Sequence, residues 1–243
     1  MSTPLNILCI DSSTEACSVA LLTKDATTYQ RFMFAPREHT QKILPTVDEV
    51  VKEASLSLSD IDVIAYGQGP GSFTGVRIGI SIAQGLAFGL EKKMVGVSTL
   101  QAMAQEAFVT NQLENKACES VYAAIDARMG EVYFAHYINV NGLMVLQDQE
   151  VVIKPEALIE KLQTTDVQIQ QNSVLVGSGW AAYPILLTAY QTCNVSEILY
   201  PNAGFMLKSA MSLIEDNCAV DPENAIPVYL RDTVTWKKLP GRE

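Results

Sequence analysis

A glycine-rich segment, residues 67–79, is the stretch of this 243-residue chain whose composition points most directly to chemistry. Glycines permit positive φ angles and close backbone approach, and a helix beginning just after them would offer free N–H groups to an anion. Asp11, at the end of an earlier apolar run, could hold a magnesium ion beside a phosphate. These features predict a phosphate or nucleotide contact at Asp11, Gly69, Gly71 and Ser72.

The same residues also have purely structural interpretations. The glycine spacing matches neither the P-loop pattern nor a regular GxGxxG, so a tight strand-to-helix corner explains the segment more simply. An aspartate at a strand end commonly caps a turn, and Asp126 holds the matching place in the second half. Asp126, Arg128 and Glu131 form a polar cluster for which we expect a structural salt bridge. Both interpretations of the glycine-rich segment stay open on the sequence alone.

Histidine and cysteine are too sparse for a further metal or nucleophilic site. The chain has two histidines, His39 and His136, and five cysteines without a CxxC pair, whereas a structural zinc site needs about four ligands. So few histidines give no convincing serine–histidine–aspartate order. We therefore expect no catalytic residue. We also expect reduced thiols, with a Cys9–Cys17 disulfide across a hairpin as the alternative.

The net charge of −10, from 17 basic and 27 acidic side chains, argues against a protein that binds nucleic acid by itself. Such binding is driven by counterion release at a basic surface, and here only Arg231, Lys237, Lys238 and Arg242 form a local basic patch. The start of the chain has no signal-peptide pattern, and polar residues and glycines interrupt the apolar run at residues 78–90. We expect a cytoplasmic protein without a membrane segment.

Alternating strands and helices predict an α/β fold built from two similar halves. The first half gives strands at residues 6–11, 17–22, 29–34, 61–66 and 94–97, and helices at 40–54, 73–89 and 99–109. The second half gives strands at 120–126, 131–138, 144–152, 174–176 and 228–230, and helices at 155–163, after 177–179, and at 206–216. The polar stretch 111–119 separates an N-terminal lobe (1–110), completed by the helix at 206–216, from a C-terminal lobe (111–243).

Five ordered segments of the chain resemble the TsaB (YeaZ) family. They are DSSTEACSVAL (11–21), PREHTQKILP (36–45), GPGSFTGVRIG (69–79), AIDARMGEVY (124–133) and PVYLRDTVTWKK (227–238). The resemblance spans nearly the whole chain, with a looser match over residues 139–220. It implies an ASKHA fold, the actin and sugar-kinase architecture of two ribonuclease-H-like lobes.

The resemblance also implies a function beside another protein. Members of this family are non-catalytic scaffolding or activating subunits that pair with TsaD, which moves a threonylcarbamoyl group to the tRNA adenosine next to the anticodon. TsaE, an ATPase, joins the pair. The resemblance thus implies that no cofactor is tightly bound, that ATP and metal are used by the partner subunits, and that tRNA is met only through the complex.

One departure separates this chain from the catalytic relatives. TsaD-like proteins carry an HxxxH metal pair at the start of a helix, and in our alignment Thr99 and Met103 stand in those places. Neither side chain replaces imidazole as a ligand for iron or zinc, so no metal site is expected. The missing ligands also disfavour a metallopeptidase. An ASKHA-type phosphotransferase remains the alternative, although the chain is short and shows no adenosine motif beyond residues 177–179.

Two apolar helices are the predicted partner surface. We expect the helices at 40–54 and 73–89 to lie side by side and to expose one apolar strip that meets TsaD, and that pairs the chain with itself when TsaD is absent. The expected contact residues are Ile43, Val47, Val50, Phe73, Val76 and Ile80, with Arg77 as a polar anchor. Glycines spaced four apart, Gly75 with Gly79 and Gly85 with Gly89, would let another backbone come close.

Overall fold

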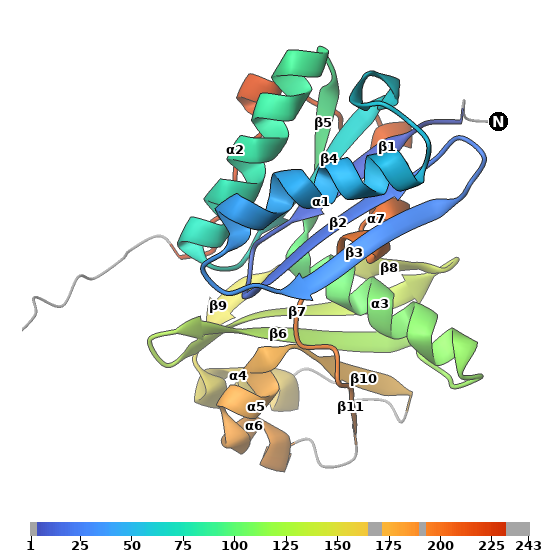
Figure 1. Cartoon of the computed structure of the whole chain (residues 1–243). Helices are drawn as coiled ribbons and strands as arrows, with labels where there is room; N and C mark the ends of the chain where they lie inside the picture. The colour runs from blue at the N-terminus through green and yellow to red at the C-terminus, as the bar shows by residue number, and fades with distance from the viewer. Residues whose placement is uncertain (1–3, 165–171, 190–192, 232–243) are drawn as a thin grey trace, which may run out of the picture.

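The computed structural model describes residues 4–164, 172–189 and 193–231, and it stacks two β-sheets in layers with helices (Figure 1). The first sheet has the strand order β3-β2-β1-β4-β5. Its strands are β1 (Ile7–Asp11), β2 (Ala16–Leu22), β3 (Thr28–Phe34), β4 (Val63–Gly69) and β5 (Lys93–Ser98). Strands β1, β2 and β3 form an antiparallel meander, while β4 and β5 run parallel to β1.

The second sheet repeats this topology. Its strands are β6 (Ser120–Arg128), β7 (Glu131–Val140), β8 (Leu143–Leu146), β10 (Ser173–Val176) and β11 (Asn194–Val195), with β9 (Val151–Ile153) paired to β7. Strands β6, β7 and β8 form an antiparallel meander, and β10 and β11 run parallel to β6. The second sheet therefore follows the order β8-β7-β6-β10-β11, strand for strand the order of the first. This repeat confirms the two-lobed α/β architecture of the ASKHA type.

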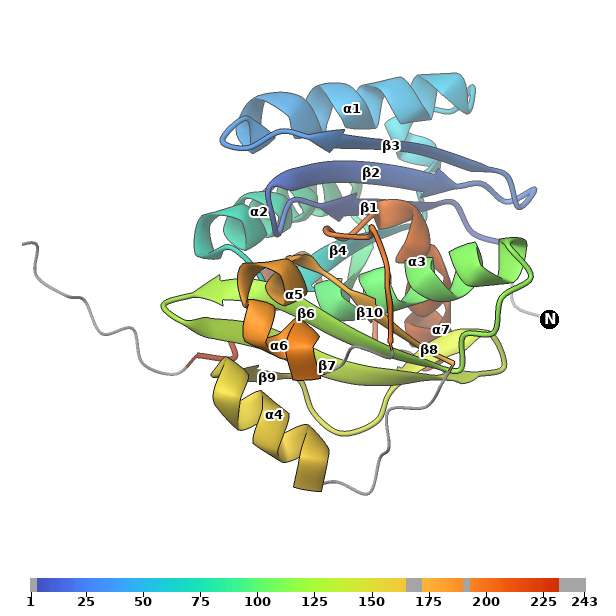
Figure 2. The ribbon, with the colours of Figure 1, turned by 90° about the horizontal axis from the view of Figure 1, so that it is seen from below.

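Helices form three layers around the two sheets. They are α1 (His39–Glu53), α2 (Phe73–Leu90), α3 (Thr99–Leu113), α4 (Pro155–Thr164), α5 (Ser178–Ala182), α6 (Pro184–Ala189) and α7 (Leu207–Glu215), with short 3₁₀ turns η1 (Leu58–Asp60), η2 (Ala203–Phe205) and η3 (Pro222–Asn224). Helices α1 and α2 cover one face of the first sheet, α7 packs on its other face, and α3 lies between the sheets (Figures 1 and 2). Helices α4, α5 and α6 lie on the far face of the second sheet. Helix α7 thus packs on the first lobe although it comes late in the chain.

Three expected elements of the second half differ in the structure. The strand expected at residues 144–152 is split into β8 and β9, because Glu150 turns inward to hydrogen-bond Ser98 and Tyr137. The single helix expected after residues 177–179 is broken between α5 and α6 at Tyr183, where the following proline disfavours helical geometry. The strand expected at residues 228–230 does not form, and Val228 donates one backbone hydrogen bond of 2.8 Å to the carbonyl of Gln68.

Strand β1 is buried on both faces, so its side chains alternate between two cores. Leu8 and Ile10 point toward the core beneath α1 and α2, whereas Ile7 and Cys9 point toward the core formed with α3 and α7. Cys17 on β2 lies in the first of these cores, and Cys9 is paired in register with Ala20. The alternative of a Cys9–Cys17 disulfide is therefore wrong, since the two free thiols lie on opposite faces of the sheet.

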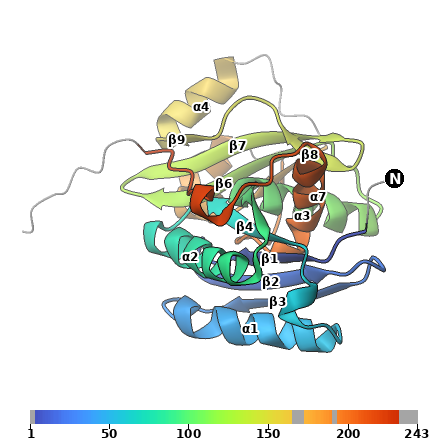
Figure 3. The same cartoon turned by 90° about the horizontal axis from the view of Figure 1, so that it is seen from above.

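After α7 the chain returns across the first lobe toward the second, and we call residues 218–231 the C-terminal strap (Figure 3). Val220 bridges to Met94, and the Gln84 amide on α2 donates to two carbonyls of the strap at 2.9 and 3.0 Å. At its far end Arg231 forms an ion pair with Glu131 at the base of the β6–β7 turn. The strap therefore connects α2 of the first lobe to the leading hairpin of the second.

The structure corrects most of the expected partner strip. Five of its members are buried in their own lobe, with side chains no more than 4% exposed: Ile43, Val47, Val50, Val76 and Ile80. They pack on the first sheet with Ala83 and Ala87, because that sheet needs an apolar cover and these residues share the face of each helix that meets it. Only Phe73 and Arg77 of the predicted set lie at the surface.

This correction changes the expected result of placing a charge at residue 76. Val76→Glu would bury a carboxylate without a partner, so we expect the lobe to lose about 4 kcal/mol or more of unfolding free energy. Ser81→Glu, an exposed position on the same helix, is the matched control and should change stability by less than about 0.5 kcal/mol. Chemical denaturation of both variants measures the difference, and equal stability would mean that Val76 does not face the core.

Candidate functional site

The glycine-rich loop between β4 and α2 is packed against the turn that follows β1. The backbone N–H of Ser72 donates to the carbonyl of Ser13 at 2.6 Å, and the Ser12 hydroxyl donates to the carbonyl of Gly75 at 2.9 Å. A Cβ atom at Gly71 would lie 2.2 Å from the Ser13 carbonyl oxygen, and one at Gly75 would lie 2.3 Å from that of Ser12. Glycine is therefore required at both positions for a contact within the chain, as the structural interpretation of this loop predicts.

Asp11 lies inside this contact. Its Oδ1 atom accepts hydrogen bonds from the backbone N–H and the hydroxyl of Ser13, at 3.0 and 2.9 Å. Its buried Oδ2 atom has no hydrogen-bond partner among the described residues, and a Cβ atom at Gly67 would lie 1.8 Å from it. Burial raises the pKa of the Asp11 carboxyl to about 6, although the Ser13 hydrogen bonds act in the opposite direction. Asp11 is thus a turn cap that burial makes costly to ionise.

The four residues of the predicted phosphate contact lie in different environments. Asp11 is buried, the Gly69 backbone lies beneath the strap with its would-be Cβ 3.0 Å from the Val228 carbonyl oxygen, and Gly71 is covered by Ser13. Only Ser72 is exposed, and its hydroxyl accepts from the Gly75 N–H as the N-cap of α2. A phosphate contact at these residues stays a prediction. Within the described ranges, no group of three or more histidine, cysteine, aspartate and glutamate side chains is placed to hold a metal ion.

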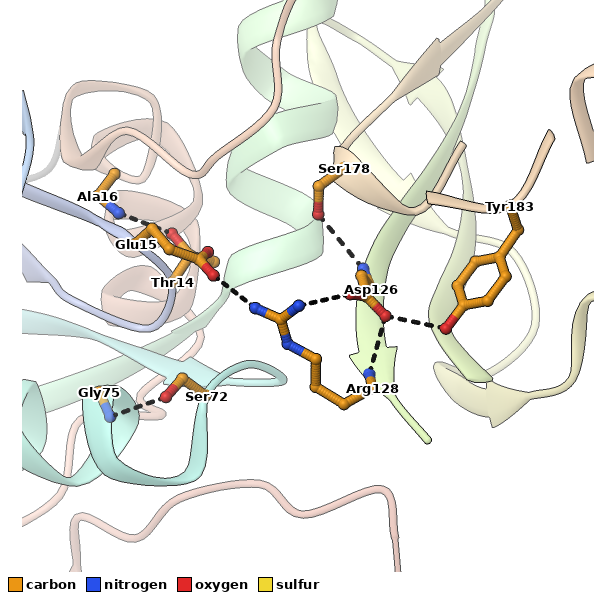
Figure 4. Close-up of polar contacts among 9 residues, drawn as sticks. All are labelled: Thr14, Glu15, Ala16, Ser72, Gly75, Asp126, Arg128, Ser178 and Tyr183. Carbon is orange, nitrogen blue, oxygen red and sulfur yellow. Dashed lines mark hydrogen bonds and ion pairs between the residues drawn. The ribbon is translucent and has the colours of Figure 1, made fainter. Parts of the chain in front are cut away.

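The matching corner of the second lobe carries an ion-pair network instead of a buried acid (Figure 4). Asp126 accepts from the backbone N–H of Arg128 at 2.9 Å and from the Tyr183 hydroxyl at 3.0 Å. The Arg128 guanidinium bonds Asp126 at 3.0 Å and reaches across to Glu15 of the first lobe at 2.9 Å. The salt bridge expected within Asp126, Arg128 and Glu131 thus involves the first two, while Glu131 pairs with Arg231.

The glycines of residues 177–179 also serve internal packing. A Cβ atom at Gly177 would lie 2.0 Å from the carbonyl oxygen of Ala124 on β6, and one at Gly179 would lie 3.0 Å from the carbonyl carbon of the same residue. Gly177 has a positive φ of 104°, which other residues rarely adopt. The only segment that the sequence offered as an adenosine motif is therefore placed against its own sheet.

Thr99 and Met103, which occupy the expected histidine positions, are both fully buried at the start of α3. The Thr99 hydroxyl donates to the carbonyl of Pro70 in the glycine-rich loop. Met103 belongs to the core between α3 and the second sheet, and its terminal methyl would lie 3.1 Å from a Cβ atom at Gly177. Each side chain therefore joins α3 to a loop rather than facing an open cavity.

The outer side of α2 is the candidate partner surface. Phe73 is 57% exposed, Phe88 is 77% exposed and Leu44 on α1 is 49% exposed. Single exposed apolar side chains are common on protein surfaces, whereas a group of them usually marks an interaction site. A groove between α1 and α2 is lined by Thr40, Phe73, Thr74, Arg77, Ile78, Ser81 and Ile82. Cβ atoms at Gly85 and Gly89 would meet nothing within 4 Å. We call this side, formed by Phe73, Arg77, Ile78, Ser81, Ile82, Gly85, Phe88 and Gly89, the α2 face.

The sequence pattern contained part of this surface. The i, i+4 series Ile78, Ile82 and Leu86 marked a second apolar side of α2, and these residues lie at its margin, half-buried. The exposure of Phe88 and Leu44 and the Glu15–Arg128 bridge had no sequence signal, because each depends on how distant segments are brought together.

Helix α2 is also the one described helix that passes a test of length and composition for a membrane span, with a mean hydropathy of 1.3 over 18 residues. The interruptions at residues 78–90 therefore do not exclude such a span by composition. The structure gives the helix another explanation, because Val76, Ile80, Ala83 and Ala87 are buried against the first sheet as in a core helix.

Comparison with known proteins agrees with this architecture. The family model for TsaD, tRNA N6-adenosine threonylcarbamoyltransferase, matches residues 33–239. The tRNA threonylcarbamoyladenosine biosynthesis protein TsaB of Escherichia coli is 49% identical over 98% of this chain and the whole of that protein, and the TsaB of Haemophilus influenzae is 43% identical over 98% of this chain and 99% of that one. The solved structure of YeaZ from Pseudomonas aeruginosa is 37% identical, covers 93% of this chain and all of that one, and superposes with a TM-score of 0.79.

Two α/β lobes of one topology, with the first hairpin of each packed on a glycine-containing loop, define a protein of the ASKHA class. Within that class the two relatives described above, which each match 98% of the chain, carry one name. The chain belongs to the TsaB family, as its five sequence segments predicted.

The raised pKa of Asp11 predicts how stability depends on pH. The folded pKa (about 6) exceeds the ordinary value of 3.8, so the folded state binds the proton more tightly than the unfolded state. The stability that this proton binding contributes is fully present below pH 3.8 and is lost as the pH rises through 6. Relative to Asp11→Asn, the wild type should lose about 3 kcal/mol of unfolding free energy between pH 3.5 and pH 7. Urea denaturation of both proteins across this range measures it, with Asp216→Asn, exposed after α7, as the control. A pH-independent difference would contradict a neutral buried carboxyl.

Proposed function

We propose that this chain is a non-catalytic scaffolding and activating subunit that pairs with TsaD through the α2 face, for threonylcarbamoylation of the tRNA adenosine next to the anticodon. TsaE joins the pair in this proposal. The observation that carries it is the α2 face itself: an apolar, glycine-notched helix surface on which Phe73 and Phe88 remain 57% and 77% exposed.

Gly85 and Gly89 support pairing by helix-to-helix contact. A glycine in a helix interior costs about 1 kcal/mol relative to alanine, and in this lobe neither glycine makes room for a neighbouring atom. Other glycines differ in this respect, because a backbone oxygen lies within 2.3 Å of the position that a Cβ atom would take at Gly71, Gly75 and Gly177. The simplest use for an open notch on an apolar helix is the close approach of a second helix.

A partner with the same fold suits this surface. The family model of the transferase matches most of this chain, so TsaD is expected to have helices equivalent to α1 and α2. Two such helix pairs would form a four-helix bundle around a pseudo-two-fold axis, and in the absence of TsaD two copies of this chain would use the same face. The two associations should therefore compete.

The chemistry is assigned to the partners. Thr99 and Met103 are engaged in internal contacts where the catalytic relatives carry metal ligands, which supports a role without a catalytic centre of its own. We propose that ATP and metal are used by TsaD and TsaE, that no cofactor is held tightly by this chain, and that its net charge of −10 leaves tRNA binding to the complex. Such a subunit would act in the cytoplasm.

The alternative of an ASKHA-type phosphotransferase receives less support. A phosphate loop must present backbone N–H groups to the ligand, whereas Ser12 and Ser13 cover the glycine-rich loop and Ala124 covers residues 177–179. Calorimetric titration of the isolated chain with ATP and magnesium tests this alternative, and tight binding with turnover would favour it over a scaffolding role.

Substitution of Gly85 should move stability and association in opposite directions. Gly85→Ala should stabilise the isolated chain by about 1 kcal/mol, because the helix gains propensity and no atom is displaced. Gly85→Ala should weaken TsaD binding, and Gly85→Leu should weaken it further as the side chain fills the notch. Thermal denaturation gives the first quantity, and calorimetry with TsaD and analytical ultracentrifugation of the chain alone give the others.

Ala157→Leu provides the matched control, since it adds bulk at an exposed position of α4 on the other lobe and should leave both associations unchanged. If TsaD binds the wild type and both Gly85 variants equally well, the interface lies elsewhere on the molecule.

A further inference from the structure

The single charged residue of α2 is held in a fixed place by two aromatic rings. The Cζ atom of Arg77 lies 3.5 Å from the ring centroid of Phe73, on the same helix, and 5.5 Å from that of Tyr229, on the C-terminal strap. Its Nε atom donates a 2.7 Å hydrogen bond to the Tyr229 hydroxyl. Arginine stacked on aromatic faces loses much of its rotational freedom before any partner arrives.

The strap that supplies Tyr229 is itself fixed on α2. The Gln84 amide donates to the carbonyls of Pro222 and Ala225, about two turns along the helix from Arg77. Beyond these contacts the strap presents Ile226, which is 67% exposed, and Tyr229, which is 46% exposed. The strap therefore widens the α2 face on the side opposite α1 (Figure 3). Arg77 lines the groove between α1 and α2 and also contacts Tyr229 of the strap.

The guanidinium group retains binding capacity toward an anion. Five N–H donors belong to an arginine, and the contacts within the described residues use the Nε–H and the ring-facing side of the group. No aspartate or glutamate of the described ranges pairs with Arg77, although the chain has 27 acidic residues and other arginines such as Arg31 and Arg231 are paired. The free edge carries the two terminal nitrogens, which match the two oxygens of a carboxylate.

We propose that Arg77, clamped between Phe73 and Tyr229, is the cationic anchor of the α2 face and receives an aspartate or glutamate carboxylate of TsaD in two parallel hydrogen bonds. The proposal rests on the proposed function and makes the C-terminal strap a third element of the docking surface beside α1 and α2. An arginine that aromatic side chains hold in place, and that becomes buried when a partner docks, is the kind of residue on which interface affinity concentrates. An unlike partner is favoured over a second copy, because α2 has no acidic residue to offer in return and the three acidic residues of α1 are already paired within the chain.

The test measures TsaD affinity of the full chain at low and high ionic strength by calorimetry. Arg77→Gln should weaken binding by about 30-fold at low salt and should reduce the salt dependence of the dissociation constant, since one charge pair is lost. Arg77→Lys keeps the charge without the two-pronged geometry and should restore only part of the affinity. Tyr229→Phe removes the hydroxyl that orients the guanidinium and should weaken binding several-fold while the salt dependence remains.

Lys116→Gln is the control, because it removes the same charge at an exposed site just beyond α3. Arg77 is exposed, so circular dichroism should show each variant folded. If TsaD does not bind the wild type, the proposed function fails. If TsaD binds wild type and Arg77→Gln equally, or with the same salt dependence, only the anchor proposal is overturned. An effect confined to self-association would also overturn it, in favour of a second copy as the occupant.

Discussion

The first lobe depends on the direct contact between the turn after β1 and the backbone of the glycine-rich loop. Ser12 and Ser13 hydrogen-bond to Gly75 and Ser72, and at Gly71 and Gly75 there is no room for a Cβ atom between the two segments. This contact fixes the start of α2 beside the end of β1, and so it fixes the rotation of the helix about its axis. Val76 and Ile80 then face the sheet, and Ile82, Gly85 and Phe88 are left on or near the outside. The proposed partner surface is in this sense a consequence of a glycine contact at the start of the helix.

The second lobe uses the same device with a different electrostatic outcome. Ala124 on β6 contacts Gly177 and Gly179 as the first turn contacts Gly71 and Gly75, so both lobes close their strand-to-helix corners by backbone packing. The acids at the two corners have diverged. Asp11 is enclosed, with a raised pKa, whereas Asp126 is tied to Arg128 and, through it, to Glu15 of the other lobe. The duplicated topology therefore carries one corner that is sealed and one that links the lobes.

Sequence patterns were sufficient for the order and kind of most elements, because strand alternation, helix spacing and glycine-rich corners are local. The duplicated topology followed from that order, and the family followed from five motifs. The sequence could not show which side of α2 faces the sheet. Both the pair Val76 and Ile80 and the pair Ile78 and Ile82 follow helical spacing, and only packing on the sheet decides between them. For the same reason the sequence pattern assigned Ile43, Val47 and Val50 to the partner surface, although they pack on the sheet. The strap could not be foreseen, because these contacts join residues 100 or more positions apart.

The positions that would carry metal ligands in the catalytic relatives have become part of the joint between the lobes. Thr99 begins α3 and binds Pro70 in the first lobe, while Met103, one turn later, fills the core beside Gly177 of the second. Ser98 next to them caps the same helix and bonds Glu150 of the second lobe. A pair of imidazoles here would need an open, polar cavity, whereas these three residues need close contact. A chain that carries Thr99 and Met103 thus keeps α3 in close contact with both lobes, which agrees with the proposed role of a subunit that offers a binding surface.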